Sequence, residues 1–170
     1  AEPFDLFKNY IDQNALDGQI DFNNTIAISP FNENLIATGG LCIWASTDGG
    51  LSWDQKTGYW PPSNNYIHPD QHIVTFKSNG DLYVGNDGGI FRSIDEAENF
   101  DFISNGLSIS QFYRFELTND EGNTWGGTQD NGILQRENPN SNVFEAYATG
   151  DGYDVMTDHP GRTNNGDSDD

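Results

Sequence analysis

The sequence contains little positive charge and a single cysteine. Its 170 residues include 7 Lys and Arg but 27 Asp and Glu, which gives a formal net charge of -20. Nucleic acid is therefore an unfavourable partner, because phosphate binding requires clustered Lys and Arg. Cys42 has no partner for a disulfide within the chain, and the apolar residues around it predict a buried side chain. No apolar run reaches the roughly 18 residues of a membrane-spanning helix, so no transmembrane segment is expected.

Common catalytic signatures are also missing. The sequence has no Gly-x-Ser-x-Gly turn for a nucleophilic serine and no glycine-rich loop followed by lysine for phosphate binding. Glycine and aromatic residues are abundant instead, with 19 Gly, 11 Phe, 7 Tyr and 4 Trp. Disordered chains are poor in aromatic residues, so this composition predicts a folded domain with many turns.

Short apolar segments that alternate with polar residues recur with a period of about 40 to 47 residues. Each unit has the same order: a strand, a polar turn, a strand ending in glycine, an Asp-Gly or Asn-Gly type turn, and a third strand. The three strands are expected at 25–30, 35–40 and 43–46, then at 73–77, 82–85 and 90–93, then at 112–117, 124–127 and 133–136. A fourth strand is expected near Trp53, Phe100 and Phe144.

Four short antiparallel strands per repeat are typical of propeller blades. The sequence therefore predicts an all-β fold, a portion of a β-propeller with about three four-stranded blades and the start of another. The expected boundaries are 1–24 (a loop or the end of a preceding blade), 25–56 (blade), 57–72 (long loop), 73–104 (blade), 105–149 (blade) and 150–170 (first strand of the next blade, from Tyr153, and a polar tail). A helix over 4–14 is an alternative for the first segment. Because a closed ring needs at least about four blades, the remaining blades of a larger propeller are expected as partners.

The stretch from Ser46 to Trp53 resembles the Asp-box, the Ser-x-Asp-x-Gly-x-Thr-Trp turn of sialidase-like and sortilin-like propellers, also called the BNR repeat. Its structural residues are Ser46, Asp48, Gly50 and Trp53, and a degenerate copy keeps Ser93, Asp95 and Phe100 but loses the glycine. The third blade has no such box. In this resemblance the box is a structural turn, in which the aspartate accepts turn amides, glycine permits positive φ and the tryptophan packs into the blade.

Further stretches at 66–72, 85–90, 127–132 and 150–152 resemble secreted bacterial Asp-box proteins related to sortilin-type and xyloglucanase-type propellers. Many of these come from Bacteroidetes and are exported by the type IX system. The resemblance implies a secreted or cell-surface protein. It does not imply one activity, because such proteins include glycoside hydrolases, adhesins and uncharacterised exoproteins.

Blade topology predicts that the loop entering the first strand and the loop between the second and third strands lie on one face. The candidate residues on this face are His68, Asp70, His72, Asp87, Gln129, Asp130 and Asp151. His68, Asp70 and His72 are spaced i, i+2 and i+4, so in an extended segment they would hold a transition metal. Pro69 opposes a regular strand there, and hydrogen bonding to neighbouring loops is the alternative. Ca²⁺ bound by Asp87, Asp130 and Asp151 is a second option, against each aspartate bracing its own turn.

Glycoside hydrolysis needs two carboxyl groups at a suitable separation, and Asp130 paired with Asp70 or Asp151 is the candidate pair. Tyr59 and Trp60 lie in the long loop, where exposed rings would stack on sugars or else cover the blade edge. Three functions follow as hypotheses. The first is an extracellular recognition or adhesion module for a glycan or a surface protein. The others are a glycoside hydrolase and a structural spacer of a large surface protein.

Overall fold

A computed structural model of the chain describes residues 22–60, 63, 65–117 and 123–156. Over these residues, twelve strands form three four-stranded antiparallel sheets. The first sheet contains β1 (Thr25–Ile28), β2 (Ile36–Gly39), β3 (Ile43–Ser46) and β4 (Asp54–Gln55). The second contains β5 (Gln71–Phe76), β6 (Leu82–Asn86), β7 (Gly89–Ser93) and β8 (Asp101–Phe102), and the third β9 (Phe112–Leu117), β10 (Thr124–Thr128), β11 (Ile133–Arg136) and β12 (Glu145–Ala146).

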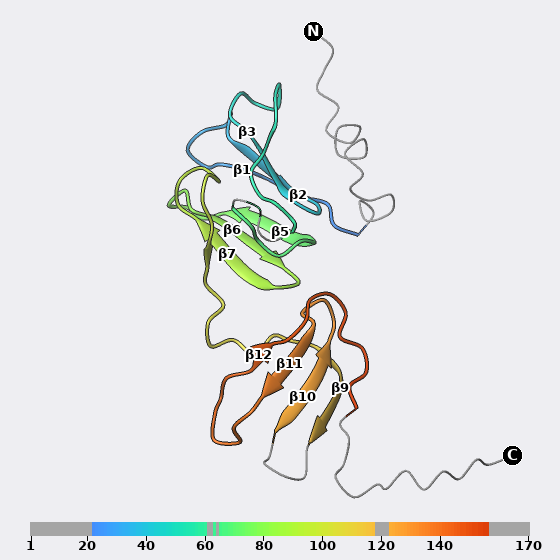
Figure 1. The fold of residues 1–170 in the computed structure, drawn as a ribbon. Coiled ribbons are helices and arrows are strands. Elements are labelled where there is room, and N and C mark those ends of the chain that lie inside the picture. Colours follow the sequence, from blue (N-terminus) through green and yellow to red (C-terminus); the bar gives the residue numbers. More distant parts are fainter. Residues whose placement is uncertain (1–21, 61–62, 64, 118–122, 157–170) are drawn as a thin grey trace, which may run out of the picture. The chain divides into compact units, whose positions relative to one another are not determined.

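Every sheet follows chain order, so each strand pairs with its neighbour in sequence (Figure 1). This confirms the all-β prediction and the four strands of each repeat, including the short fourth strands after Trp53, Phe100 and Phe144. The first two sheets belong to one compact unit, Ala1–Leu107, and the third belongs to a second unit, Ser108–Asp170. Among the described residues, no helix has the length and apolar character required to cross a membrane.

The pairing registers make the repeats directly comparable. Ile36 pairs with Ser46 in the first sheet, and Leu82 pairs with Ser93 in the second. Counting from these pairs, Ile26 and Ile28 of β1 occupy the places that Val74 and Phe76 occupy in β5. By the same count His72 in β5 and Tyr113 in β9 are at equivalent positions of their repeats. Each lies at a break in the register of the first strand of its sheet.

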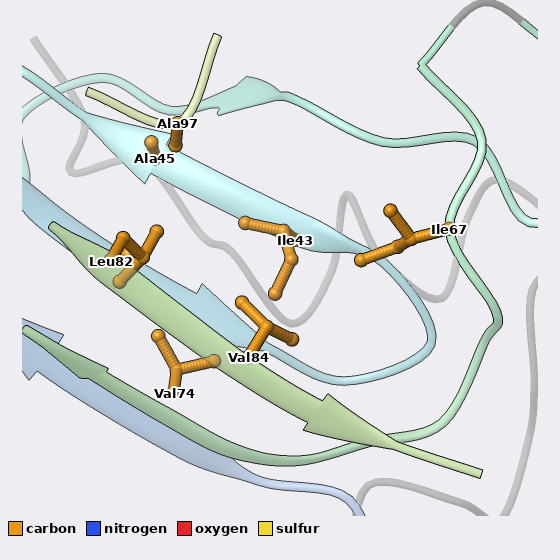
Figure 2. Close-up of a cluster of buried hydrophobic side chains, with 8 residues drawn as sticks. Ile43, Ala45, Ile67, Val74, Leu82, Val84 and Ala97 are labelled. Atoms are coloured by element: carbon orange, nitrogen blue, oxygen red, sulfur yellow. The ribbon is translucent and has the colours of Figure 1, made fainter. Parts of the chain in front are cut away.

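The core of the first unit lies between its two sheets. Ala37, Ile43 and Ala45 come from the first sheet, and Val74, Leu82 and Val84 come from the second. Figure 2 shows the second-sheet side chains directed toward β3, with Ile67 and Ala97 closing the ends of the cluster. Small residues on one sheet facing larger residues on the other allow the two to interdigitate at the density of a protein interior.

Gly39 sets how closely the two sheets approach. A Cβ at this position would lie 2.7 Å from Cβ of Gln71 and 2.9 Å from Cγ2 of Val74. The backbone N–H of Gln71 also donates to the carbonyl of Gly40 at 2.7 Å, which ties the start of β5 to the end of β2. Glycine is needed here because the backbone of β2 and the side chains of β5 occupy the same space.

A second cluster covers the outer part of the first sheet. It contains Leu41, Cys42 and Trp44, with Trp53 and Tyr59 packed against it. Cys42 is buried as the sequence predicts, and burial raises the pKa of its thiol to about 12. The thiol is therefore a core side chain and not a nucleophile.

The Asp-box turn joins β3 to β4 and has the predicted structure. Asp48 accepts hydrogen bonds from the backbone N–H of Ser52 at 2.9 Å and from its hydroxyl at 2.6 Å. Ser46 donates its hydroxyl to Asp48 at 2.8 Å and accepts the N–H of Gly50 at 2.8 Å. Gly49 and Gly50 have φ values of 74° and 91°. The indole of Trp53 donates to the carbonyl of Gly50 at 3.2 Å, which closes the turn.

The degenerate copy between β7 and β8 keeps the same geometry without glycine. Ser93 donates its hydroxyl to Asp95 at 2.8 Å, and Asp95 accepts the N–H of Asn99 at 2.9 Å. Glu96 and Ala97 have φ values of 60° and 69°, so two L-residues adopt the left-handed conformation that Gly49 and Gly50 adopt in the first box.

Three expectations for the chain ends have different outcomes. The helix over 4–14 and the polar tail over 163–170 lie outside the described residues. The strand expected from Tyr153 is not formed, since no strand is assigned over 151–156. A strand requires a hydrogen-bonded neighbour along its length. The backbone of this segment instead meets the turn between β10 and β11, through a bridge from Asn131 to Gly150 and a hydrogen bond from the N–H of Gly152 to the carbonyl of Thr128 at 2.8 Å.

Candidate functional site

In the first unit, the side chains of His72 and Asp87 are in hydrogen-bonding contact. Nε2 of His72 lies 2.6 Å from Oδ1 of Asp87, and both side chains are partly exposed. The ring of Phe22 meets the imidazole edge-on, with centroids 5.5 Å apart. His72 projects to this contact because it lies at the register break of β5, where the regular alternation of side chains is interrupted.

His68 and Asp70 make other contacts. The ring of His68 packs against Gly88, and its backbone carbonyl accepts the side-chain amides of Gln71 at 2.7 Å and Asn86 at 2.8 Å. Asp70 has a φ of 64° and accepts a hydrogen bond from Nδ2 of Asn23 at 2.7 Å. Both residues therefore brace the entry into β5.

The structure does not bring His68, Asp70 and His72 together as metal ligands. The i, i+2, i+4 argument fails because Asp70 is left-handed and His72 lies at a register break, so the segment does not alternate as a strand would. Over the residues that the structure describes, no group of three or more His, Cys, Asp or Glu side chains is arranged to hold a metal ion. Asp87 belongs to the first unit and Asp130 and Asp151 to the second, so Ca²⁺ binding by these three residues stays a prediction.

In the second unit, Asp130 and Asp151 are neighbours. The backbone N–H of Asp130 donates to Oδ1 of Asp151 at 3.2 Å, and Asp130 itself has a φ of 59° in the turn between β10 and β11. Gln129 contributes its backbone to this turn, donating its N–H to the carbonyl of Gln111 at 2.9 Å. Asp130 and Asp151, one of the two residue pairs predicted from the sequence, thus lie within one unit, and their contact joins the backbone of Asp130 to the carboxylate of Asp151.

Two tyrosines complete this site. The rings of Tyr113 and Tyr153 are stacked, with centroids 5.4 Å apart and an interplanar angle of 8°. Their exposed fractions are 42% and 64%. The hydroxyl of Tyr113 donates to Oδ1 of Asp151 at 3.3 Å. Desolvation and then the negative charge of Asp151 raise the pKa of Tyr113.

Sequence reasoning missed both tyrosines as site residues. Tyr113 occupies the repeat position of His72, so an alignment of the repeats by strand register would have selected it. Tyr153 had no such signal, because its place depends on how the segment after β12 returns to β10. Gly127 and Gly152 are in close contact there, with no room for a Cβ on either residue.

The aromatic residues of the long loop have separate roles. Trp60 is 65% exposed, whereas Tyr59 is partly buried against the second hydrophobic cluster. Their rings lie 6.3 Å apart at an angle of 57°, so they do not form one flat platform. Only Trp60 remains available for stacking on a ligand. The prediction that residues of both units share one face stays a prediction.

No protein-family model matches the chain, and no curated protein matches it. Among solved structures, Ycf48 bound to a D1 peptide matches with a TM-score of 0.37 and 17% identity, over 72% of this chain and 38% of that one. An ancestral GH74 enzyme matches with a TM-score of 0.42 and 16% identity, over 71% of this chain and 19% of that one. The GH74 enzyme of Niastella koreensis matches with a TM-score of 0.38 and 13% identity, over 72% of this chain and 24% of that one.

The chain thus spans less than two fifths of the length of each of these proteins. All three are β-propellers, and this chain matches a part of each. The likeness to these structures concerns the fold and gives this chain neither a ligand nor an activity.

Proposed function

We propose that the chain is part of an extracellular recognition or adhesion module that binds a neutral glycan. The binding surface consists of Tyr113, Tyr153, Asp130 and Asp151, called the tyrosine–aspartate surface below. The observation that carries the proposal is the exposed, stacked pair of tyrosines beside the carboxylate of Asp151.

This surface offers the two kinds of contact that a sugar ring uses. The exposed face of Tyr153 is a flat apolar surface for the C–H groups of a pyranose. Carboxylate oxygens accept hydrogen bonds from sugar hydroxyl groups. The carboxylate of Asp151 contacts the hydroxyl of Tyr113, and Asp130 is its neighbour through a backbone hydrogen bond. A formal net charge of -20 repels sialylated or sulfated glycans, so a neutral glycan is the better match.

We also propose that the chain works within a larger propeller and outside the cell. The support is the resemblance of the turn from Ser46 to Trp53 to the Asp-box of secreted bacterial proteins, together with the short share of each similar structure that the chain covers. Fractionation of the producing cells tests the location, because recovery of the protein in the cytoplasm alone would contradict it.

The test of binding is a screen on an array of neutral and acidic glycans, followed by calorimetry. Tyr153→Ala is expected to weaken binding of a neutral glycan about tenfold or more, because stacking and burial of one aromatic ring is lost. Trp60→Ala is the matched control: it removes an equally exposed aromatic ring in the first unit and should leave the affinity unchanged. Equal losses from both variants, or no glycan binding at all, would contradict the proposal.

The contact between Asp130 and Asp151 keeps glycoside hydrolysis as a second candidate. The same glycans are incubated with the protein and assayed for released reducing ends. Binding without turnover supports the recognition module. Turnover that is abolished by Asp130→Asn and Asp151→Asn would make the protein a hydrolase. Binding to proteins but to no glycan would favour a protein partner, and no binding of either kind would favour a structural spacer.

A further inference from the structure

The first strand of the first sheet exposes two large aliphatic side chains. Ile26 and Ile28 have exposed fractions of 64% and 59%. Both point to the same side of β1, because they are two residues apart in a regular strand. The surface formed by these two side chains is called the isoleucine face below.

The second sheet shows how the equivalent positions are covered. In β5 the positions equivalent to Ile26 and Ile28 are Val74 and Phe76. Val74 is buried and belongs to the core cluster, and Phe76 packs against the same cluster. The two sheets are therefore alike in the size and polarity of these positions, and they differ in whether a neighbouring sheet covers them.

The sheet that covers Val74 has a distinct composition. It presents the small residues Ala27, Ala37, Gly39 and Ala45, together with the larger Ile43, from β1 to β3, all on the side opposite the isoleucine face. A Cβ on Gly39 would lie 2.9 Å from Cγ2 of Val74, so the valine fits against bare backbone. The large side chains of β5, the first strand of its sheet, thus pack against alanine and glycine of the sheet that comes before it in the chain.

We propose that the isoleucine face is a docking surface for one further four-stranded antiparallel sheet, which presents alanine and glycine from its inner strands. This inference rests on the larger propeller assembly proposed above, and it specifies the surface and the composition of the partner. The docked sheet packs on β1 in the same way that β1 and β2 pack on β5. It covers Ile26 and Ile28 as Val74 and Phe76 are covered.

A second copy of this chain is a poorer occupant of the face. Each copy carries a formal net charge of -20, so pairing two copies brings like charges together. The alanine and glycine side of the first sheet is also already filled by Val74, Leu82 and Val84, so a second copy cannot offer it.

The probe is a tandem chain in which residues 22–69 are duplicated directly ahead of residue 22 of the full sequence. The added sheet then has the same connection to β1 that the first sheet has to β5. Both copies of Cys42 are changed to alanine, and Ile26 of the original sheet is changed to cysteine. Maleimide labelling of this cysteine is expected to slow about tenfold or more in the tandem chain relative to the original-length chain.

Leu51→Cys provides the control, because Leu51 is exposed in the Asp-box turn between β3 and β4, and its labelling should be equally fast in both chains. Unchanged labelling of the cysteine at position 26 would overturn the proposal, as would an added sheet that fails to increase the β-structure measured by circular dichroism. Labelling of the original-length chain that slows as its concentration rises would also overturn it, since a second copy would then be the occupant.

A glycan-binding assay on the same tandem sample separates the two proposals. Protection at position 26 with no glycan binding would contradict only the proposed ligand. Glycan binding without protection would contradict only the docking surface.

Discussion

The carboxylate of Asp95 accepts two hydrogen bonds from Asn99, one from the backbone N–H at 2.9 Å and one from the side-chain amide at 2.8 Å. In the first Asp-box, Asp48 receives the same pair of bonds from the N–H and the hydroxyl of Ser52. An amide and a hydroxyl therefore serve equally as the second donor. The turn therefore requires the aspartate acceptor. The two glycines of the first box can be replaced by L-residues, as Glu96 and Ala97 show, but these residues then adopt a strained left-handed backbone.

That strain predicts a stabilising substitution. Glu96 is left-handed with a φ of 60°, where the equivalent Gly49 has 74°. Glu96→Gly should raise the free energy of unfolding by about 0.5–1 kcal/mol, because relief of the left-handed penalty exceeds the added entropy of the unfolded chain. Glu96→Ala keeps an L-residue while removing the charge, so it should leave stability nearly unchanged. Urea denaturation measures both, and equal effects of the two variants would refute the strain argument.

The pH dependence of stability should report on the first Asp-box. Donation by the hydroxyl and N–H of Ser52, and then by the hydroxyl of Ser46, lowers the pKa of Asp48 to about 2. The unfolded chain binds this proton near pH 3.9, at about the ordinary aspartate pKa. The stabilisation is therefore complete above about pH 4 and is lost as the pH falls toward about 2.

Asp48→Asn tests this assignment. The variant should melt at a lower temperature than the original chain at neutral pH, and the difference should shrink as the pH falls below about 4. Thermal melts across this range provide the measurement. Asp54→Asn, on the exposed strand β4, is the matched control and should melt at the temperature of the original chain at neutral pH. If the difference in melting temperature between Asp48→Asn and the original chain does not change with pH, the charge of Asp48 does not stabilise the turn.

Much of the fold is predictable from the sequence because its signals are local. Alternating apolar residues and Asp-Gly turns identify the strands, and one Asp-box with its degenerate copy fixes where the third strand meets the fourth. The segment after Gly150 is different. Tyr153 was expected to begin a strand from its apolar alternation, but a strand also needs a hydrogen-bonded neighbour, which local sequence does not supply.

The equivalence of Val74 and Ile26 predicts unequal costs for the same kind of truncation. Val74→Ala should lower the free energy of unfolding by roughly 2 kcal/mol, because it removes buried methyl groups from the core between the two sheets. Ile26→Ala should cost at most about 0.5 kcal/mol in the original-length chain, because its side chain is exposed. Chemical denaturation distinguishes them, and equal costs would mean that Ile26 is covered within the chain itself.

The candidate site was only partly predictable for a related reason. The loop rule expected Asp130, Asp151, His72 and Asp87 on one face. The structure has a contact between Asp130 and Asp151 and another between His72 and Asp87, and the contact of the histidine was not predicted as such. The proposed metal site failed because it assumed an extended backbone through Pro69. The stacking of Tyr113 on Tyr153 depends on the register break in β9 and on the path after β12, neither of which is encoded in a short motif.

The last prediction concerns the proton of Tyr113. Desolvation and the charge and hydrogen bond of Asp151 raise the pKa of this phenol, because a negative neighbour opposes formation of the tyrosinate. Asp151→Asn removes the charge, so the pKa of Tyr113 should fall toward its ordinary value. Carbon NMR of ring-labelled tyrosine resolves this titration from those of the other six tyrosines among the 7 in the chain. Asp154→Asn is the control, since Asp154 pairs with Arg114 and is not among the groups that raise the Tyr113 pKa. An unchanged Tyr113 titration in Asp151→Asn would mean that Asp151 does not contact the tyrosine pair in solution, and the tyrosine–aspartate surface would lose its central contact.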